Sequence, residues 1–144
     1  ISLGLVGSEM CIRDRAARVL IVGAGGLGSP AGLYLAGAGI GTLGIVDGDI
    51  VEESNLHRQV IHTEANIGKN KTVSAKEAIF NFNHHIKVIT YETRLKKDNA
   101  KEIVEGWDIV MDGSDNPATR YLINDICMIL KKPLVSGSAI QLEG

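Results

Sequence analysis

The sequence predicts an α/β fold, in which a doubly wound, mainly parallel sheet carries helices on both of its faces. Two observations support this prediction. Short runs of aliphatic and β-branched residues alternate with segments of helical periodicity, and strands that alternate with helices form parallel sheets with right-handed crossovers. The first such run leads into a glycine turn, Gly23-x-Gly25-x-x-Gly28, which is typical of Rossmann-like nucleotide-binding folds.

The first half of the pattern contains two strands and two helices. Arg18–Val22 is a β-branched run that suits a strand buried on both faces. After the glycine turn, residues 27–38 are rich in Ala, Leu and Gly and have a proline in the first turn, which predicts a helix packed closely on the sheet. Thr42–Val46 predicts the second strand. Beyond a polar loop, residues 71–83 carry an apolar face at helical spacing and predict the second helix.

The second half continues the alternation. Further strands are expected at Lys87–Tyr91, Ile109–Asp112 and residues 134–138. Residues 98–104 are expected to form a short helix with Asp98 near its N-cap. Pro117–Leu130 predicts a long helix, for which Ser114 and Asp115 are alternative N-caps.

The composition is that of an ordinary globular chain. Its 144 residues are enough for one domain with a real core, and 44% of them are hydrophobic. The net charge of −2 gives no basic footprint for nucleic acid, and no apolar run reaches the roughly 18 residues of a membrane helix. The two cysteines, Cys11 and Cys127, form no CxxC pair, which indicates neither a disulfide framework nor a complete zinc site and favours a cytoplasmic location.

The first 15 residues, ISLGLVGSEMCIRDR, have no convincing period. Their LVGSEMCIRD segment resembles the conceptual translation of a transposase adapter used in DNA sequencing libraries. We therefore expect residues 1–15 to be a sequence scar rather than native protein. A signal peptide is the alternative, but the stretch begins without a basic region and contains Glu9, Arg13 and Asp14.

The predicted strands end in residues that can bind a nucleotide. Ligands of parallel α/β sheets bind outside the carboxyl ends of the strands. At the first strand end, Gly25, Gly26 and Gly28 let the backbone approach a phosphate at a helix N-terminus. Asp47 ends the second strand and can accept hydrogen bonds from ribose hydroxyls. These features suit a nicotinamide dinucleotide and ATP equally, and a turn that only packs a helix on a strand remains the alternative.

The charge on the phosphates distinguishes the two candidate nucleotides. The pyrophosphate of a dinucleotide carries about two negative charges and ATP about four, so ATP needs side-chain cations and usually a metal. Arg58 offers a planar fork of donors, Lys71 opens the second helix as a point charge, and Asp115 is a carboxylate suited to Mg²⁺. Asn55 and Asn116 add neutral hydrogen-bonding groups. Each residue alone could be an ordinary loop, helix-start or N-cap residue, but their convergence on one sheet edge favours ATP.

Six segments also carry a family resemblance. They are GAGGLGSP, VDGD, ESNLHRQ, IGKNKTVSA, DGSDNPATRYLIND and PLVSGSAIQLEG. Their order and spacing resemble those of the ubiquitin-activating-enzyme-like adenylyltransferases, the ThiF/MoeB/HesA family. The chain looks most similar to members that activate ubiquitin-like sulfur carriers for molybdenum cofactor biosynthesis, thiamine synthesis or tRNA thiolation. The resemblance implies that residues 16–144 are the N-terminal part of an ATP-binding adenylation domain, truncated at its C-terminus.

The reaction implied by the resemblance is ATP-dependent adenylation of the C-terminal glycine of a sulfur-carrier protein that ends in Gly-Gly, with release of pyrophosphate. ATP and Mg²⁺ are the implied cofactors, and the complete protein is expected to be a homodimer with no nucleic-acid or membrane partner. The family's catalytic cysteine and zinc-binding cysteines are expected beyond Gly144, and its upstream arginine is missing from the N-terminal region. We therefore expect this chain to bind ATP weakly and to be incomplete for turnover.

The resemblance also implies a set of site residues. Gly26 would contact the phosphates, Asp47 the ribose and Asp115 the Mg²⁺ ion. The residues expected to bind the nucleotide are Gly25, Gly26, Gly28, Asp47, Ser54, Asn55, Leu56, His57, Arg58, Gln59, Lys71, Asp115 and Asn116. Arg58, Lys71 and Asp115 are the expected catalytic residues, acting by positioning and electrostatic stabilisation.

Two alternative functions remain open at this point. A nicotinamide-dependent oxidoreductase would fit the glycine turn, but we find no hydride-transfer site in the sequence. An inactive scaffold subunit of a heterodimeric activating enzyme is disfavoured by the presence of Arg58, Lys71 and Asp115. The four histidines show no metal-ligand spacing, and Cys127 is expected to be a buried core thiol.

Overall fold

The structure is a computed structural model that describes residues 17–25, 32, 35, 39–57, 59 and 61–136. The expected scar at residues 1–15 lies outside this range. So does the expected helix at residues 27–38, apart from Gly32 and Leu35, which are both helical. Three predicted site residues, Gly26, Gly28 and Arg58, also lie outside the described residues.

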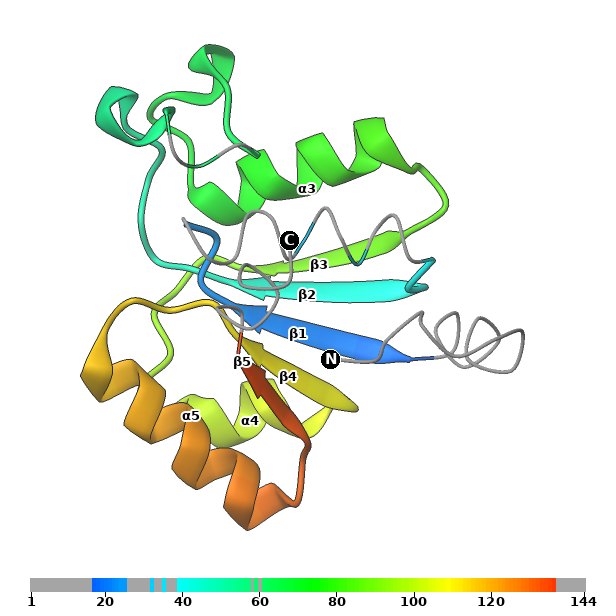
Figure 1. Ribbon diagram of the computed structural model, residues 1–144, viewed down its shortest axis with the longest axis vertical. Helices are drawn as coiled ribbons and strands as arrows, with labels where there is room; N and C mark the ends of the chain where they lie inside the picture. Colours follow the sequence, from blue (N-terminus) through cyan, green and yellow to red (C-terminus); the bar gives the residue numbers. More distant parts are fainter. Residues whose placement is uncertain are drawn as a thin grey trace.

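Five parallel strands form the sheet. They are β1 (Arg18–Val22), β2 (Thr42–Val46), β3 (Lys87–Tyr91), β4 (Ile109–Asp112) and β5 (Leu134–Ser136). Their order in the sheet is β3-β2-β1-β4-β5, so the chain runs outward from β1 to β3 and then returns to the other side of β1 (Figure 1). The predicted doubly wound, parallel α/β fold is confirmed, and the first four strands have the predicted bounds.

The strand register brings the carboxyl ends of the strands to one edge. Val22, the last residue of β1, lies opposite Val46 of β2 and Asp112 of β4. Val46 in turn lies opposite Tyr91, the last residue of β3. The segments that follow these four strands therefore start side by side.

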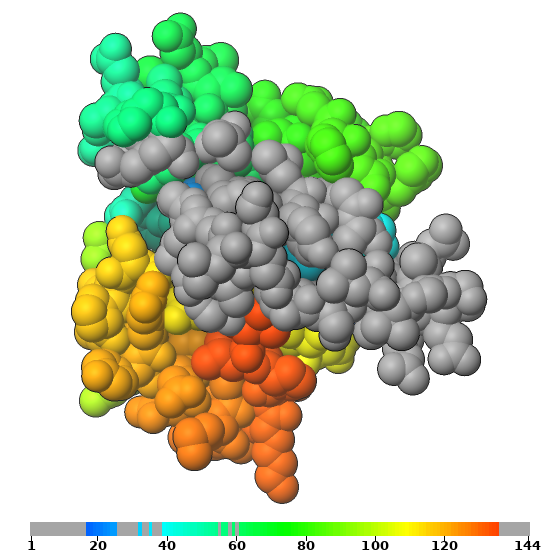
Figure 2. All heavy atoms as spheres, viewed as in Figure 1, coloured from blue at the N-terminus to red at the C-terminus, as the bar shows by residue number. Residues whose placement is uncertain are grey.

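Helices cover both faces of the sheet, as predicted. The described helices longer than one turn are α3 (Lys71–Phe82), α4 (Ala100–Glu105) and α5 (Pro117–Leu130), and two 3-10 turns, η1 (Glu53–Asn55) and η2 (Glu64–Asn66), precede α3. α3 lies on one side of the sheet, and α4 and α5 lie on the other (Figure 1). The space-filling view shows α3 in green and α5 in orange at opposite ends of the molecule (Figure 2). None of the described helices is long and apolar enough to cross a membrane.

Strand β1 separates two hydrophobic cores. Val19 and Ile21 belong to the core beneath α3, whereas Leu20 and Val22 belong to the core beneath α4 and α5. This alternation follows from the two-residue period of a strand, and it explains why the whole run is apolar. Cys127 is buried in the second core, as predicted.

The helix starts correct two predictions. Asn116, rather than Ser114 or Asp115, caps α5, because its Oδ1 atom accepts hydrogen bonds from the backbone N–H groups of Ala118 and Thr119 at 2.9 and 3.4 Å. Helix α4 begins at Ala100, two residues later than predicted, and its N-cap is Asn99, the residue after Asp98. The Asn99 side chain instead closes the preceding turn by accepting from the backbone N–H of Lys96 at 2.7 Å.

Candidate functional site

A cavity of about 730 Å³ lies at the carboxyl edge of the sheet. It is lined by Gly23 and Gly25 after β1, Asp47 after β2, residues 93–96 after β3 and residues 113–116 after β4, together with Gln59 and Lys71. β1 and β4 are neighbours in the sheet but not in sequence, so the cavity sits where the strand order reverses. Ligands of doubly wound sheets bind at this point.

The floor of the cavity is a contact between two backbone segments. The Gly23 N–H donates to the carbonyl of Val46 at 2.8 Å, and the Gly113 N–H donates to the carbonyl of Val22 at 2.9 Å. Gly23 has a φ of +99°, and a Cβ atom placed there would lie 2.8 Å from the Gly113 carbonyl oxygen. Only glycine fits both the backbone angle and the space, so the segments after β1 and β4 can approach each other here.

Asp47 connects the glycine turn to the end of β2. Its Oδ2 atom accepts a hydrogen bond from the Ala24 N–H at 2.8 Å, and its Oδ1 atom accepts one from the Asp49 N–H at 2.8 Å. A carboxylate has about four acceptor positions, so two of them remain after these bonds. Asp47 also lines the cavity, where its remaining acceptor positions suit ligand hydroxyl groups.

Lys71 brings a cation to the cavity. It is the first residue of α3, as predicted, and is only 7% exposed. Asn70 holds this helix start in place, because its Oδ1 accepts from the Thr72 N–H at 2.8 Å and its Nδ2 donates to the Asp47 carbonyl at 3.1 Å. No described carboxylate forms an ion pair with Lys71. A lysine that lines the cavity without such a partner has a positive charge available to an anionic ligand.

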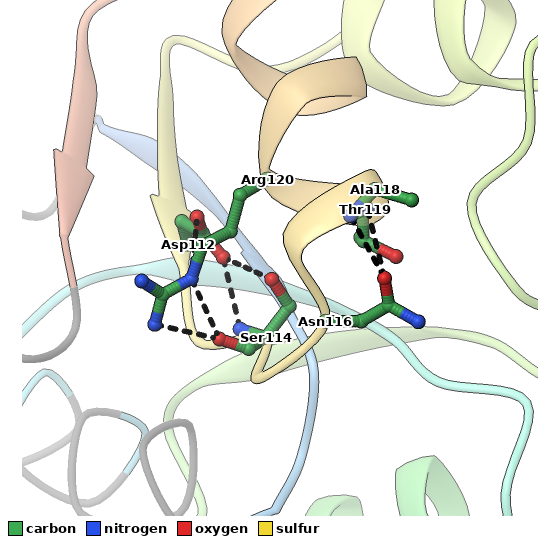
Figure 3. A network of polar contacts seen from close by, with 6 residues as sticks. All are labelled: Asp112, Ser114, Asn116, Ala118, Thr119 and Arg120. Atoms are coloured by element: carbon green, nitrogen blue, oxygen red, sulfur yellow. Dashed lines mark hydrogen bonds and ion pairs between the residues drawn. The ribbon is translucent and has the colours of Figure 1, made fainter.

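A polar network holds the segment between β4 and α5, which contributes to the lining of the cavity (Figure 3). The N–H and hydroxyl groups of Ser114 donate to Oδ1 of Asp112 at 2.9 and 2.6 Å. The guanidinium of Arg120 donates through Nε and Nη2 to the Ser114 carbonyl at 3.3 and 3.2 Å. These bonds fix the loop in which Asp115 and Asn116 face the cavity. Asp112 and Arg120 were not among the predicted site residues, although both stand in the DGSDNPATR segment.

Six of the predicted site residues line this one cavity. They are Gly25, Asp47, Gln59, Lys71, Asp115 and Asn116. Three others, Ser54, Leu56 and His57, belong to the segment at η1 and are not among the residues that line the cavity in the described part of the chain. The side chain of Asn55 is not described.

No preformed metal cluster exists among the described residues, since no three His, Cys, Asp or Glu side chains gather closely enough to hold an ion. Asp115 is exposed and lines the cavity. Mg²⁺ is commonly bound by one or two carboxylates that share it with substrate phosphates. The arrangement around Asp115 fits that kind of site, in which the nucleotide supplies the other ligands.

Comparisons with known proteins agree with this architecture. A family model described as the ThiF family matches residues 1–144. The chain belongs to the ThiF family. The resemblance seen in the six sequence segments is thereby confirmed.

Sequence relatives of this ThiF-family chain include two named proteins. One is "Adenylyltransferase and sulfurtransferase MOCS3" of Culex quinquefasciatus, which is 55% identical over 144 residues, all of this chain and 33% of that protein. The other is "Adenylyltransferase and sulfurtransferase uba4" of Aspergillus clavatus, which is 58% identical over 142 residues, 99% of this chain and 28% of that protein. The chain thus spans about a third of the length of the relatives it matches.

Solved structures of two further proteins have the same fold. The E. coli tRNA N6-threonylcarbamoyladenosine dehydratase TcdA, in complex with ATP, matches with a TM-score of 0.85 and 30% identity over 92% of this chain and 55% of that one. E. coli MccB with AMPCPP and MccA matches with a TM-score of 0.80 and 30% identity over 88% of this chain and 38% of that one. In the TcdA structure a fold of this kind holds ATP.

A histidine that sequence analysis left without a role lies directly behind the glycine turn. His62 is 5% exposed and contacts Ala24 and Ser74. Burial lowers the pKa of His62 from its usual value of 6.5. The hydrogen bond to the Ala24 carbonyl raises this pKa in part, the positive charge of Lys71 lowers it and the negative charge of Asp47 raises it. The net result is that the folded protein favours a neutral His62.

This lowered pKa predicts a loss of stability in acid. The unfolded chain binds a proton on His62 near pH 6.5, whereas the folded chain binds it only at lower pH, so the stabilising contribution is complete above pH 6.5 and is lost as the pH falls through the folded-state pKa. Urea unfolding at pH 7.5 and 5.5 should show a smaller loss for His62→Gln than for the unchanged chain. His85 is exposed, so His85→Gln is the matched control. Between the two pH values it should lose as much free energy of unfolding as the unchanged chain. Equal losses in all three proteins would contradict a neutral, buried His62.

Proposed function

We propose that this chain is the nucleotide-binding part of an adenylyltransferase, which uses ATP to activate the C-terminal glycine of a ubiquitin-like sulfur-carrier protein. One observation carries the proposal: the nearly buried Lys71, without a described carboxylate partner, shares a cavity at the switch point with the glycine turn, Asp47 and Asp115. The names of the MOCS3 and uba4 relatives support the same activity. Membership of the ThiF family argues against a nicotinamide-dependent oxidoreductase.

The residues have distinct proposed roles around ATP. Gly25, with Gly26 and Gly28, presents backbone N–H groups to the phosphates, and Asp47 accepts hydrogen bonds from the ribose. Lys71 balances part of the roughly four negative charges of the triphosphate. Asp115 holds Mg²⁺, which offsets phosphate charge when bound, and Asn116 borders the same space.

The segment before α3 completes the proposed site. Arg58 and Asn55 are proposed to reach the phosphates, and Gln59 lines the cavity beside the glycine turn. Ser54, Leu56 and His57 are proposed to approach the nucleotide when it binds. Arg58, Lys71 and Asp115 form the proposed catalytic set, and none of them needs to act as a nucleophile.

The proposed reaction is a transfer of AMP. The terminal carboxylate of the carrier attacks the α-phosphorus of ATP, and a new C–O–P linkage forms. The bond between the α-phosphorus and the bridging oxygen breaks, and its electron pair leaves with pyrophosphate. Catalysis then consists of holding the two reactants in line and stabilising the charge on the phosphates, which is how phosphoryl-transfer sites generally work.

The partners of the complete protein are also proposals. We propose a carrier that ends in Gly-Gly, as the family resemblance implies. The family resemblance is the basis for proposing a homodimer, a catalytic cysteine and a cysteine-bound zinc ion in the complete protein, and the cysteine usage is the basis for proposing a cytoplasmic location. Molybdenum cofactor biosynthesis and tRNA thiolation are the proposed pathways.

Carrier-dependent exchange of labelled pyrophosphate into ATP tests the proposal. The complete protein that contains this chain should catalyse exchange when a ubiquitin-like carrier ending in Gly-Gly is present, and not when the carrier lacks its last glycine. The isolated chain should bind ATP in preference to NADH in calorimetric titrations. Binding of NADH without ATP would favour an oxidoreductase, and ATP binding without exchange for any carrier would favour a scaffold subunit.

The metal role of Asp115 gives a separate prediction. Asp115→Asn keeps the shape of the side chain but removes its charge, so it should raise the Mg²⁺ concentration needed for half-maximal exchange by about tenfold or more. Asp125→Asn is the control, because Asp125 is exposed on α5 and lies outside the cavity lining. An unchanged Mg²⁺ requirement in Asp115→Asn would remove Asp115 from the proposed metal site.

A further inference from the structure

Behind the glycine turn, a chain of buried hydrogen bonds fixes the protonation of His62. Its Nε2 atom lies 2.7 Å from the Ala24 carbonyl oxygen, and its Nδ1 atom lies 2.7 Å from the Ser74 hydroxyl. A carbonyl oxygen can only accept, so Nε2 carries a proton, and in the neutral ring Nδ1 is then the acceptor of a hydrogen bond from the Ser74 hydroxyl. The Asn66 side chain completes the chain by donating through Nδ2 to the Ser74 hydroxyl oxygen at 3.2 Å.

These bonds hold the peptide group that opens the glycine turn. The Ala24 carbonyl and the Gly25 N–H belong to one planar trans peptide, so the two groups point in opposite directions. His62 fixes the carbonyl end from behind, where it does not line the cavity, whereas Gly25 does line the cavity. The Ala24 N–H is fixed independently by Asp47 at 2.8 Å. With both sides of Ala24 held, the direction of the Gly25 N–H is set.

We propose that His62 is a positioning residue of the phosphate site, and that its neutral Nε2–H form aims the Gly25 N–H at the bound triphosphate. This inference rests on the proposed function and assigns a role to a residue outside the cavity. His62 acts through the backbone and does not touch the nucleotide. The Ala24 carbonyl requires the proton on Nε2, and Ser74 on α3, which accepts from Asn66 on η2, lies at Nδ1.

Two amide substitutions separate this role from simple filling of the core. The side-chain nitrogen of glutamine reaches the position of histidine Nε2, and that of asparagine reaches the position of Nδ1. His62→Gln should therefore keep the bond to the Ala24 carbonyl, and His62→Asn should lose it while still meeting Ser74. We expect His62→Asn to weaken ATP binding about tenfold and His62→Gln to weaken it less than about threefold.

The test compares ATP with adenosine, which lacks the phosphates. In calorimetric titrations, His62→Asn should bind ATP more weakly than both His62→Gln and the unchanged chain. All three proteins should bind adenosine with nearly equal affinities. Equal ATP affinities in the unchanged chain and His62→Asn would overturn the role of His62 alone. Absence of ATP binding in the unchanged chain would instead overturn the proposed function.

A spectroscopic measurement does not depend on the variants being folded. Nitrogen-15 chemical shifts of the His62 ring in the unchanged chain should show a protonated Nε2 and an unprotonated Nδ1 at pH 7.5. Addition of ATP should shift the Gly25 amide resonance more than addition of adenosine does. A protonated Nδ1 with a bare Nε2, or a Gly25 resonance that responds equally to both ligands, would overturn the proposal.

Discussion

Replacing Lys71 by methionine should lower ATP–pyrophosphate exchange in the complete protein by about a hundredfold or more, because a preorganised cation beside a developing phosphate charge stabilises the transition state strongly. Methionine keeps most of the length and apolar volume of lysine and removes only the charge. The substitution should also leave the free energy of unfolding unchanged or higher, because Lys71 is only 7% exposed and its charge has no described ion-pair partner. Exchange should therefore fall without a loss of stability, which a general loss of folding would not produce.

Lys69 provides the matched control for this experiment. It lies two residues before Lys71, is about half exposed and forms an ion pair with Glu77 at 3.8 Å. Exposed pairs of this kind contribute little, so Lys69→Met should leave exchange within about twofold of the unchanged protein. If Lys71→Met exchanged pyrophosphate as fast as Lys69→Met, Lys71 would have no part in phosphate binding.

The strands were predictable because their signals are local. Arg18–Val22 and Thr42–Val46 are short, largely apolar runs that are followed at once by Gly23 and Asp47, and in a parallel sheet such runs are buried on both faces. The location of the site was predictable for a similar reason. Once the strands alternate with helices, the rule for doubly wound sheets brings the residues after β1, β2 and β4 to one edge.

The helix starts were less predictable because neighbouring polar residues compete for the same role. The sequence analysis offered Ser114 and Asp115 as caps of α5, whereas the adjacent Asn116 takes that role. Ser114 is used elsewhere, because its hydroxyl donates to Asp112 at the end of β4. The choice of Asn116 thus depends on where strand and helix meet in space.

The role of His62 could not be predicted from sequence because it depends on contacts between distant segments. Its ring bonds to Ala24, which is 38 residues away, and to Ser74, which is 12 residues away. A lone histidine in a loop has no periodicity or metal-ligand spacing to mark it. Only the folded arrangement, in which α3 and the glycine turn lie on either side of this ring, reveals what it holds.

Replacing Gly23 by alanine should lower the free energy of unfolding by about 3 kcal/mol, because the substitution combines two costs. This loss should be larger than that from any other substitution considered above. The backbone angle φ of +99° strains any residue with a Cβ atom. That atom would also lie 2.8 Å from the Gly113 carbonyl oxygen and 3.2 Å from the Ser114 nitrogen, both of which are backbone atoms. To relieve these close contacts, β1 and β4 must separate at their carboxyl ends, where the cavity lies.

Urea unfolding of Gly23→Ala and Gly106→Ala checks this expectation. Gly106 has a φ of −80° and open space around the position of a Cβ atom, so alanine there should leave the free energy of unfolding unchanged or slightly higher. In Gly23→Ala, ATP binding should also weaken under conditions where the protein remains folded, because the displaced Ser114 carries Asp115 and Asn116 with it. A Gly23→Ala protein as stable as Gly106→Ala would show that the two backbone segments do not meet as closely as the structure describes.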